Sequence, residues 1–243
     1  MTGGRRVAGL ALWLGLAGLV AASAQEAPEF VEARRDMVEH QLKERGISDS
    51  RVLAAMGEVP RQLFVPEEHQ PQAYADDSLS IGSSGQTIHQ PYLVAQMTSL
   101  LELDRGAKVL EIGTGSGYHS AVLSKLARQV FTIEIDPAVG KLAQRNLKAA
   151  GCKNVHAKIG DGYLGWPEEA PFDSIILTTA PPRVPQPLID QLRVGGIMVL
   201  PEGDTIQNLL VITKSEDGYE RRVVKPVSLP RMKGEAERKP PTP

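Results

Sequence analysis

The chain has 243 residues, of which 42% are hydrophobic, and its formal net charge is −2. This length and hydrophobic content are enough for one α/β core and predict a single main domain. The slightly acidic balance argues against a nucleic-acid partner bound by bulk electrostatics, and an aromatic content of 5% argues against base-stacking platforms. No cluster of His, Cys, Asp and Glu has metal-ligand spacing, so we predict no metal site.

The N-terminus has the composition of a secretory signal. An arginine pair at positions 5 and 6 precedes an almost wholly apolar run, Val7–Ala22, and Ala22-Ser23-Ala24 supplies a small-x-small cleavage site. The apolar run is short for a membrane span, which needs about 20 residues. We therefore predict a signal peptide over residues 1–24 and export, with the periplasm as the expected location. The alternative is an uncleaved membrane anchor.

Residues 25–80 are expected to form a helical extension that packs on the main domain. Glu29–Arg45 has the apolar spacing of a helix and is followed by Gly46, a residue that often ends helices. A second helix is expected to run to Met56, capped from within Ser48–Ser50. None of these segments has the pattern of a cofactor-binding element.

A polar, glycine-rich loop, Ser80–Tyr92, leads into a helix predicted for Pro91–Leu101. Pro91 suits the first turn of that helix, where a missing N–H costs nothing. A solvated connector is one interpretation of the loop. The other is a binding site, because loops held against a rigid scaffold are where sites tend to lie.

The central unit of the chain is a strand, a glycine-rich turn and a helix. Lys108–Ile112 is an apolar strand, three alternate glycines follow it, and His119–Arg128 has helical character. This is the cofactor-binding unit of a doubly wound α/β sheet. A dinucleotide fingerprint would need a glycine where Tyr118 stands. The acidic residue before the glycine triplet instead resembles motif I of class I S-adenosylmethionine methyltransferases. The predicted cofactor-binding residues here are Glu111, Gly113, Thr114, Gly115, Ser116 and Gly117; a turn that binds nothing is the alternative.

Two further strands are predicted to bring side chains to the same edge of the sheet. The strand Val130–Ile135 carries Glu134 near its end, about 20 residues beyond the first glycine, where a carboxylate binds ribose hydroxyls. The strand Asn154–Ile159 precedes Gly160-Asp161-Gly162, for which we predict an adenine contact; an ordinary turn is the alternative. The predicted cofactor-binding set is therefore extended by Glu134, Ile135, Asp161 and Gly162.

The rest of the chain alternates helices and strands. We expect an α/β fold with a Rossmann-like, doubly wound, mainly parallel sheet of about seven strands and helices on both faces. The methyltransferase domain is expected over residues 81–232, and the charged, proline-rich tail 233–243 is expected to be disordered. The remaining predicted elements are a helix from Asp136-Pro137 to Ala150, strands at 172–177, 197–200, 208–213 and 219–227, a helix at 187–192, and a turn at Gly195-Gly196.

Several short motifs along the chain match one family. They are Val59-Pro60-Arg61, Phe64-Val65-Pro66, Gly85-Gln86-Thr87-Ile88, Gln90-Pro91-Tyr92, the run 111–118 and Gly160-Asp161-Gly162. With these motifs the chain resembles the protein-L-isoaspartate O-methyltransferase family from about Arg34 to Glu235. The resemblance implies methyl transfer from S-adenosylmethionine to the α-carboxylate of L-isoaspartyl residues in damaged proteins, a repair reaction. It implies isoaspartyl peptides and proteins as partners, and we expect a monomer.

The resemblance places the acceptor site on the loop before Pro91. Thr87 and Ile88 are expected to bind the substrate, and Thr178 and Thr179 to border the reacting methyl group from across the cleft. The family has a serine, regarded as its active-site residue, where this chain has His89. We predict His89 to be catalytic, donating a hydrogen bond to the carboxylate in the serine's place. The alternative is that it fills the pocket and alters substrate choice or abolishes turnover.

Two other functions stay open at this point. One is an exported, catalytically silent protein that binds damaged or extended peptides. The other is a methyltransferase with a different carboxylate acceptor. The segment Ser228–Arg231 also stands where the family usually has an aromatic residue before Val-Pro-Leu, which bears on the rim where a peptide would bind.

Overall fold

The computed structural model describes Met1 and residues 26–82 and 85–238. Apart from Met1, the predicted signal peptide lies outside the described residues, as do Ser83 and Ser84 of the polar loop. The prediction of a cleaved signal therefore stays a prediction.

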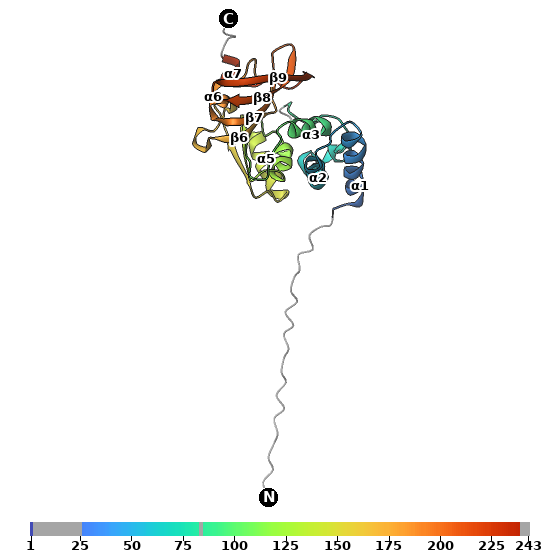
Figure 1. Cartoon of the computed structure of the whole chain (residues 1–243). Helices are drawn as coiled ribbons and strands as arrows, with labels where there is room; N and C mark the ends of the chain where they lie inside the picture. The colour runs from blue at the N-terminus through green and yellow to red at the C-terminus, as the bar shows by residue number, and fades with distance from the viewer. Residues whose placement is uncertain (2–25, 83–84, 239–243) are drawn as a thin grey trace.

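The core of the fold is a seven-stranded sheet with the order β5-β4-β3-β6-β7-β8-β9. Strands β3 to β7 are parallel, whereas β8 and β9 are antiparallel (Figure 1). This confirms the predicted Rossmann-like, mainly parallel sheet. The bounds are β3 Lys108–Ile112, β4 Gln129–Glu134, β5 Val155–Ile159, β6 Phe172–Leu177, β7 Leu192–Glu202, β8 Gln207–Ser215 and β9 Gly218–Val227; β1 Leu79–Ser80 and β2 Thr87–Ile88 form a separate antiparallel pair.

Strand β3 holds the position on which the site depends. Val109, Leu110 and Ile112 are all buried, as expected for a parallel strand that is covered on both faces. Strand β4 pairs with one edge of β3 and β6 with the other. The chain order therefore reverses at β3, and ligands of doubly wound sheets bind beyond the carboxyl ends of the strands at such a point.

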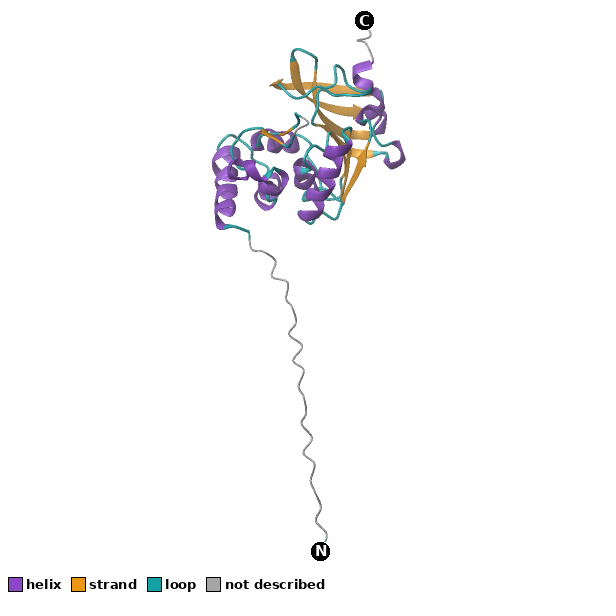
Figure 2. Ribbon diagram, turned by 180° about the vertical axis from the view of Figure 1, so that it is seen from behind, coloured by secondary structure: helices purple, strands orange, loops and turns teal. Residues whose placement is uncertain are grey.

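Helices cover both faces of the sheet. Neighbouring residues of a strand point to opposite faces, so Val109 packs in one apolar cluster and Leu110 in another. The first cluster includes α3 (Pro91–Ser99), α4 (Tyr118–Ser124) and α5 (Pro137–Ala149), and the second includes α6 (Gln186–Gln191) and α7 (Glu235–Arg238). Figure 2 shows the larger group of helices on one side of the strands.

The N-terminal extension is part of the main core. Met37, Leu42 and Met56 are fully buried, and they belong to the same cluster as Val109 of the sheet. Asp49 caps the second helix by accepting from two backbone N–H groups of its first turn, as the sequence suggested. The elements are α1 Pro28–Asp36, the π-helix η1 Met37–Lys43, α2 Ser50–Glu58, and the 3₁₀ segments η2 Arg61–Phe64 and η3 Glu67–Gln72.

Several predicted elements have different bounds in the structure, and two of these differences have a clear physical reason. Helix α4 ends at Ser124 rather than at Arg128, because the side-chain amide of Asn154 donates to the carbonyls of Ser124 and Ala127 at 3.0 and 3.1 Å and ends the helix there. The predicted turn at Gly195-Gly196 lies inside β7 as a bulge, opposite a register shift in β6. Glycine is needed at this bulge because a Cβ on Gly196 would lie 2.8 Å from a backbone carbonyl of β6.

The expectation of a disordered tail from residue 233 is wrong for residues 233–238. The short helix α7 packs Ala236 into the second apolar cluster, where it is 3% exposed. The backbone N–H of Glu235 also donates to Asp161 Oδ2 at 2.8 Å. These two contacts fix a segment that its composition alone would leave free, and residues 239–243 lie outside the described part.

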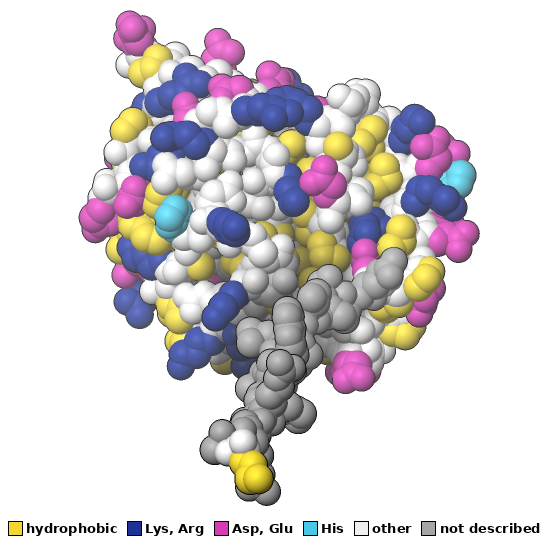
Figure 3. All heavy atoms as spheres, turned by 90° about the horizontal axis from the view of Figure 1, so that it is seen from below, with side chains coloured by type: hydrophobic (Ala, Val, Ile, Leu, Met, Phe, Trp, Pro, Cys, Tyr) yellow, Lys and Arg dark blue, Asp and Glu magenta, His cyan; other side chains and the backbone are white. Residues whose placement is uncertain are grey.

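The surface seen from below mixes charges of both signs. In Figure 3 the basic and acidic side chains of the described residues alternate with apolar ones across this face.

Among the described residues, no helix combines the length and the apolar character that crossing a membrane requires.

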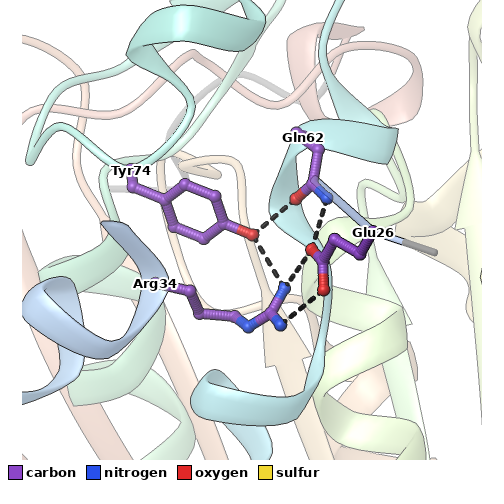
Figure 4. A network of polar contacts seen from close by, with 4 residues as sticks. All are labelled: Glu26, Arg34, Gln62 and Tyr74. Carbon is purple, nitrogen blue, oxygen red and sulfur yellow. Dashed lines mark hydrogen bonds and ion pairs between the residues drawn. The ribbon is translucent and has the colours of Figure 1, made fainter. Parts of the chain in front are cut away.

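A network of polar side chains fixes the start of the described chain (Figure 4). Glu26 accepts two hydrogen bonds from the Arg34 guanidinium at 2.6 and 2.8 Å and a third from the Gln62 amide at 2.6 Å. The hydroxyl of Tyr74 accepts from Arg34 at 3.0 Å and donates to Gln62. The hydrogen bonds from Arg34 hold the pKa of Glu26 below its usual value, although partial burial opposes them. The segment before α1 is therefore part of the fold.

Glu26→Gln removes the charge from this network, and we expect it to lower the free energy of unfolding by about 1–3 kcal/mol at neutral pH. Because the pKa of Glu26 is lowered in the folded state, its contribution is complete above the unfolded value and is lost as the pH falls through the lowered pKa. Urea unfolding of both proteins at several pH values measures this difference. The matched control is Glu29→Gln, an exposed carboxylate nearby; equal losses in the two variants would contradict the role of the network.

Candidate active site

A cleft lies at the carboxyl ends of β3, β4 and β6. Its walls are the glycine-rich turn after β3, the end of β4, the end of β6, the loop before α3, and a C-terminal segment, Pro230–Lys233. This is the place that the reversal of strand order predicts for a ligand. Most of the predicted site residues line the cleft, whereas Glu111, Gly117 and Asp161 do not. The predicted residues that line it are Gly113, Thr114, Gly115, Ser116, Glu134, Ile135, Gly162, Thr87, Ile88, His89, Thr178 and Thr179.

The glycine-rich turn is shaped by contact with β6. Gly113 has a φ of +95°, and a Cβ there would lie 2.3 Å from Thr178 Oγ1. That hydroxyl donates to the Gly113 carbonyl at 2.7 Å and thereby holds the turn against β6. Gly115 has a φ of +55°, and its missing side chain would point into open space. The turn therefore presents bare backbone to a ligand in the cleft.

Glu134 is held as a fixed carboxylate at the end of β4. Its Oε2 accepts from the backbone N–H of Gly115 at 2.9 Å, and its Oε1 accepts from that of Asp136 at 3.0 Å. Each carboxylate oxygen has a second lone pair, so Glu134 can still accept hydrogen bonds from ligand hydroxyls. Ile135, the next residue, exposes 38% of its surface and gives the cleft an apolar wall.

Glu111 lies beneath the glycine turn and does not line the cleft. Its Oε2 accepts from the hydroxyls of Ser120 and Thr132, and its Oε1 has no hydrogen-bond partner among the described residues. Burial raises the pKa of Glu111 to about 7, with a small further rise from Glu134, against the hydrogen bonds, which lower it. Glu111 therefore supports the turn from behind and is not placed to contact a ligand directly.

Asp161 is also used within the protein. Its Oδ1 accepts from the backbone N–H of Tyr163 at 2.9 Å, and its Oδ2 accepts from that of Glu235. Gly162, which does line the cleft, has no room for a side chain, because a Cβ would lie 2.3 Å from Ile112 Cγ2. In this segment Gly162 lines the cleft, whereas the Asp161 carboxylate is bound to the backbone of Tyr163 and Glu235.

The loop before α3 meets β6 directly. His89 Nε2 lies 3.0 Å from the carbonyl oxygen of Thr178, which can only accept, so Nε2 carries the proton. The other ring nitrogen, Nδ1, is then an acceptor in the neutral ring. Burial lowers the pKa of His89, and the nearby charge of Arg61 lowers it further, against the hydrogen bond to Thr178. His89 is therefore a neutral link between the loop and β6.

The sequence did not point to two groups of cleft residues. Pro230–Lys233 reach the cleft because Ala180, just beyond the end of β6, exchanges backbone hydrogen bonds with Pro230 and Met232, both at 2.8 Å. His119 lines the cleft from α4 with its Nε2 2.9 Å from the Thr98 hydroxyl, and burial lowers its pKa to about 3. The only sequence signal for the C-terminal wall was the unusual segment 228–231.

Within the described residues, no group of His, Cys, Asp and Glu is placed to hold a metal ion.

Comparisons with known proteins agree with this geometry. The family model for protein-L-isoaspartate(D-aspartate) O-methyltransferase matches residues 32–229. The chain is 51% identical over 203 residues to protein-L-isoaspartate O-methyltransferase 2 of Shewanella sediminis, covering 83% of each protein. It is 53% identical over 186 residues to protein-L-isoaspartate O-methyltransferase 1 of Syntrophobacter fumaroxidans, covering 76% of this chain and 86% of that protein.

Solved structures with the same family name superpose on this chain. A protein-L-isoaspartate O-methyltransferase structure superposes with a TM-score of 0.78 at 29% identity, covering 84% of this chain and 67% of the other. A putative protein-L-isoaspartate O-methyltransferase from Plasmodium falciparum, in complex with S-adenosyl-L-homocysteine, superposes with a TM-score of 0.72 at 25% identity, covering 82% and 98%.

Gly113→Ala tests how tightly the turn is constrained. We expect a loss of about 2–5 kcal/mol in the free energy of unfolding, because a left-handed residue with a side chain is strained and the Cβ would displace the Thr178 hydroxyl. Gly151→Ala is the matched control: Gly151 also has a positive φ, of +71°, but no atom lies within 4 Å of its Cβ position. That variant should lose only about 1–2 kcal/mol, the cost of a side chain in the left-handed conformation. Equal losses in urea unfolding would show that the contact with Thr178 does not constrain the turn.

Proposed function

The chain belongs to the protein-L-isoaspartate(D-aspartate) O-methyltransferase family, and we propose that it works at the cleft beyond β3, β4 and β6. The protein is an S-adenosylmethionine-dependent methyltransferase that methylates the α-carboxylate of L-isoaspartyl residues. One observation supports this cleft above all others: the glycine turn and the acceptor loop both contact Thr178, so the two halves of the site meet at one residue.

The cleft fits S-adenosylmethionine. The turn from Gly113 to Ser116 offers backbone with open space at Gly115, where a side chain would fill the cradle. Glu134 would accept hydrogen bonds from the ribose hydroxyls, and Ile135 with Gly162 would border the base. When bound, the cofactor supplies a methyl group activated by a sulfonium. Glu111 and Asp161 act through the backbone that they hold, which revises the direct contacts expected from the sequence.

The acceptor half has to position its substrate and exclude water. An α-carboxylate has a pKa of ~3.5 and is already ionised at neutral pH, so no strong base is needed. Buried Ile88 provides an apolar wall, and Thr87 and Thr179 line the cleft, where their hydroxyls would donate to carboxylate oxygens. Holding the oxygen in line with the methyl group can then lower the barrier without a catalytic base.

His89 has a more restricted role than the sequence suggested. Its Nε2–H is already donated to Thr178, so it can bind the carboxylate only by releasing that bond or by taking up a proton on Nδ1. A bound carboxylate favours the protonated ring, which opposes the effect of burial. We therefore propose that His89 holds the loop to β6 and donates from Nδ1 when substrate is present.

His89→Ala should lower turnover of an isoaspartyl peptide about ten- to hundredfold, because one charge-assisted hydrogen bond is worth about 1.5–3 kcal/mol. The affinity for S-adenosylhomocysteine, measured by calorimetry, should stay nearly unchanged. His40→Ala, on the exposed surface of η1, is the matched control and should have wild-type turnover.

His89→Ser restores the residue expected for the family and separates the alternatives. A large rise in isoaspartyl methylation would mean that His89 blocks or redirects the family reaction. Cofactor binding without methylation in either protein would favour a silent peptide-binding protein. Unchanged turnover in both His89 variants would show that the catalytic assignment of His89 is wrong.

We further propose that the protein is exported to the periplasm after cleavage following Ala24. The support is the charged, apolar and small-residue pattern of the N-terminus, together with Glu26, which is fixed to the fold two residues beyond the proposed cleavage point. We also propose a monomer without a nucleic-acid partner, in keeping with the net charge of −2.

Mass spectrometry of the protein purified from its native host tests the proposed export. We expect a mature chain that begins at Gln25 and is recovered from the periplasmic fraction. An intact N-terminus at Met1 in a cytoplasmic fraction would contradict the proposal.

A further inference from the structure

Arg61 is a fully buried arginine behind the acceptor loop. It opens η2 and is 0% exposed. Its Nη2 donates to the carbonyl of His89 at 2.8 Å, and its Nε donates to the carbonyl of Ala73 at 2.6 Å. The centre of the guanidinium lies 4.7 Å from the ring centroid of Tyr118, and Tyr118 lines the cleft. One side chain thus ties the acceptor loop to the N-terminal extension.

The charge of Arg61 is not neutralised within the described structure. No carboxylate among the described residues forms an ion pair with it, and its Nη1 has no hydrogen-bond partner. Asp76 contributes some negative potential, but it is already paired with Arg45. The other buried arginine of this region, Arg34, differs in having the carboxylate of Glu26. A buried charge without a counter-ion is costly, and such a group is uncommon unless something else compensates for it.

We propose that Arg61 is a positioning residue of the acceptor site: it holds the main chain of His89 and supplies the positive charge that the isoaspartyl carboxylate offsets on binding. This inference rests on the proposed function. Arg61 does not line the cleft and bonds the His89 carbonyl, so it acts through the loop and through its field rather than by touching substrate.

The chemistry of the reaction predicts whether the charge of Arg61 affects substrate affinity or turnover. Methylation converts a carboxylate into a neutral ester, so a fixed cation favours the bound acid over the bound product. Part of the carboxylate charge is already lost in the transition state. The charge of Arg61 should therefore act mainly on substrate affinity, whereas its two hydrogen bonds to backbone carbonyls should act mainly on turnover through the position of the loop.

Two substitutions separate these contributions. Arg61→Lys keeps the charge but replaces the rigid fork, which a single ammonium cannot reproduce. We expect kcat to fall about tenfold while KM for an isoaspartyl peptide changes less than about twofold. Arg61→Met removes both the charge and the fork, and we expect KM to rise about tenfold in addition to the fall in kcat. Arg61→Gln is a second neutral variant in case Arg61→Met does not fold.

The titration of His89, followed by NMR, gives an independent readout. The charged and titratable groups that face His89 are Arg61 from η2 and His119 from α4, and the carbonyl of Thr178, after β6, accepts a hydrogen bond from its Nε2. Removing the cation should raise the pKa of His89 in Arg61→Met and Arg61→Gln, and leave it nearly unchanged in Arg61→Lys. A purely structural role would not distinguish the neutral variants from the charged one in this way.

Arg34→Met is the matched control, since it removes a buried arginine that lies outside the cleft. It should lower stability and leave the pKa of His89 and the KM for peptide unchanged. If neutral Arg61 variants keep wild-type KM and the same His89 pKa while the wild-type enzyme methylates the peptide, the inference is wrong although the proposed function stands. If the wild-type enzyme fails to methylate the peptide, the proposed function fails first.

Discussion

Both halves of the cleft depend on Thr178. Its backbone N–H continues the β6 pairing to Ile112 at 2.9 Å, and its hydroxyl holds the carbonyl of Gly113. Its own carbonyl accepts a hydrogen bond from His89 Nε2. One residue at the end of one strand thus fixes the cofactor turn on one side and the acceptor loop on the other. Any displacement of β6 would move both together, which keeps their relative geometry constant. For a reaction that needs alignment rather than a base, that constancy is what the fold has to supply.

The buried ionisable groups around this point follow one electrostatic pattern. Burial raises the pKa of Glu111 and lowers those of His89 and His119, so each is shifted towards its neutral form. Glu134, which is also buried, accepts hydrogen bonds from the backbone N–H groups of Gly115 and Asp136. Arg61 is the exception, because an arginine stays protonated in proteins even when burial opposes it. A site in which these buried groups favour their neutral forms, with the Arg61 cation bonded to the acceptor loop and with Arg231 and Lys233 in the C-terminal wall, is suited to admit a carboxylate and to release a neutral ester.

The sequence predicted the elements of the site better than the direction of its side chains. The strand Lys108–Ile112, the glycine turn and the carboxylate of Glu134 follow from periodicity and spacing, because backbone geometry requires them locally. Asp161 was predicted as a ligand contact because it ends a strand, yet its carboxylate binds the backbone of Glu235, far away in the sequence. Composition likewise predicted a disordered tail, where Ala236 is in fact buried. The partners of Asp161 and the burial of Ala236 depend on contacts between segments that are far apart in the sequence, and local sequence patterns do not predict such contacts.

We propose that this cleft methylates isoaspartyl carboxylates with His89 in place of the family serine. The most direct measurement is transfer of a labelled methyl group from S-adenosylmethionine to an isoaspartyl peptide and to its aspartyl twin, with cofactor binding measured on the same preparation. We expect a base-labile ester on the isoaspartyl peptide and none on the twin. Tight binding of S-adenosylhomocysteine without methylation of the isoaspartyl peptide would contradict it.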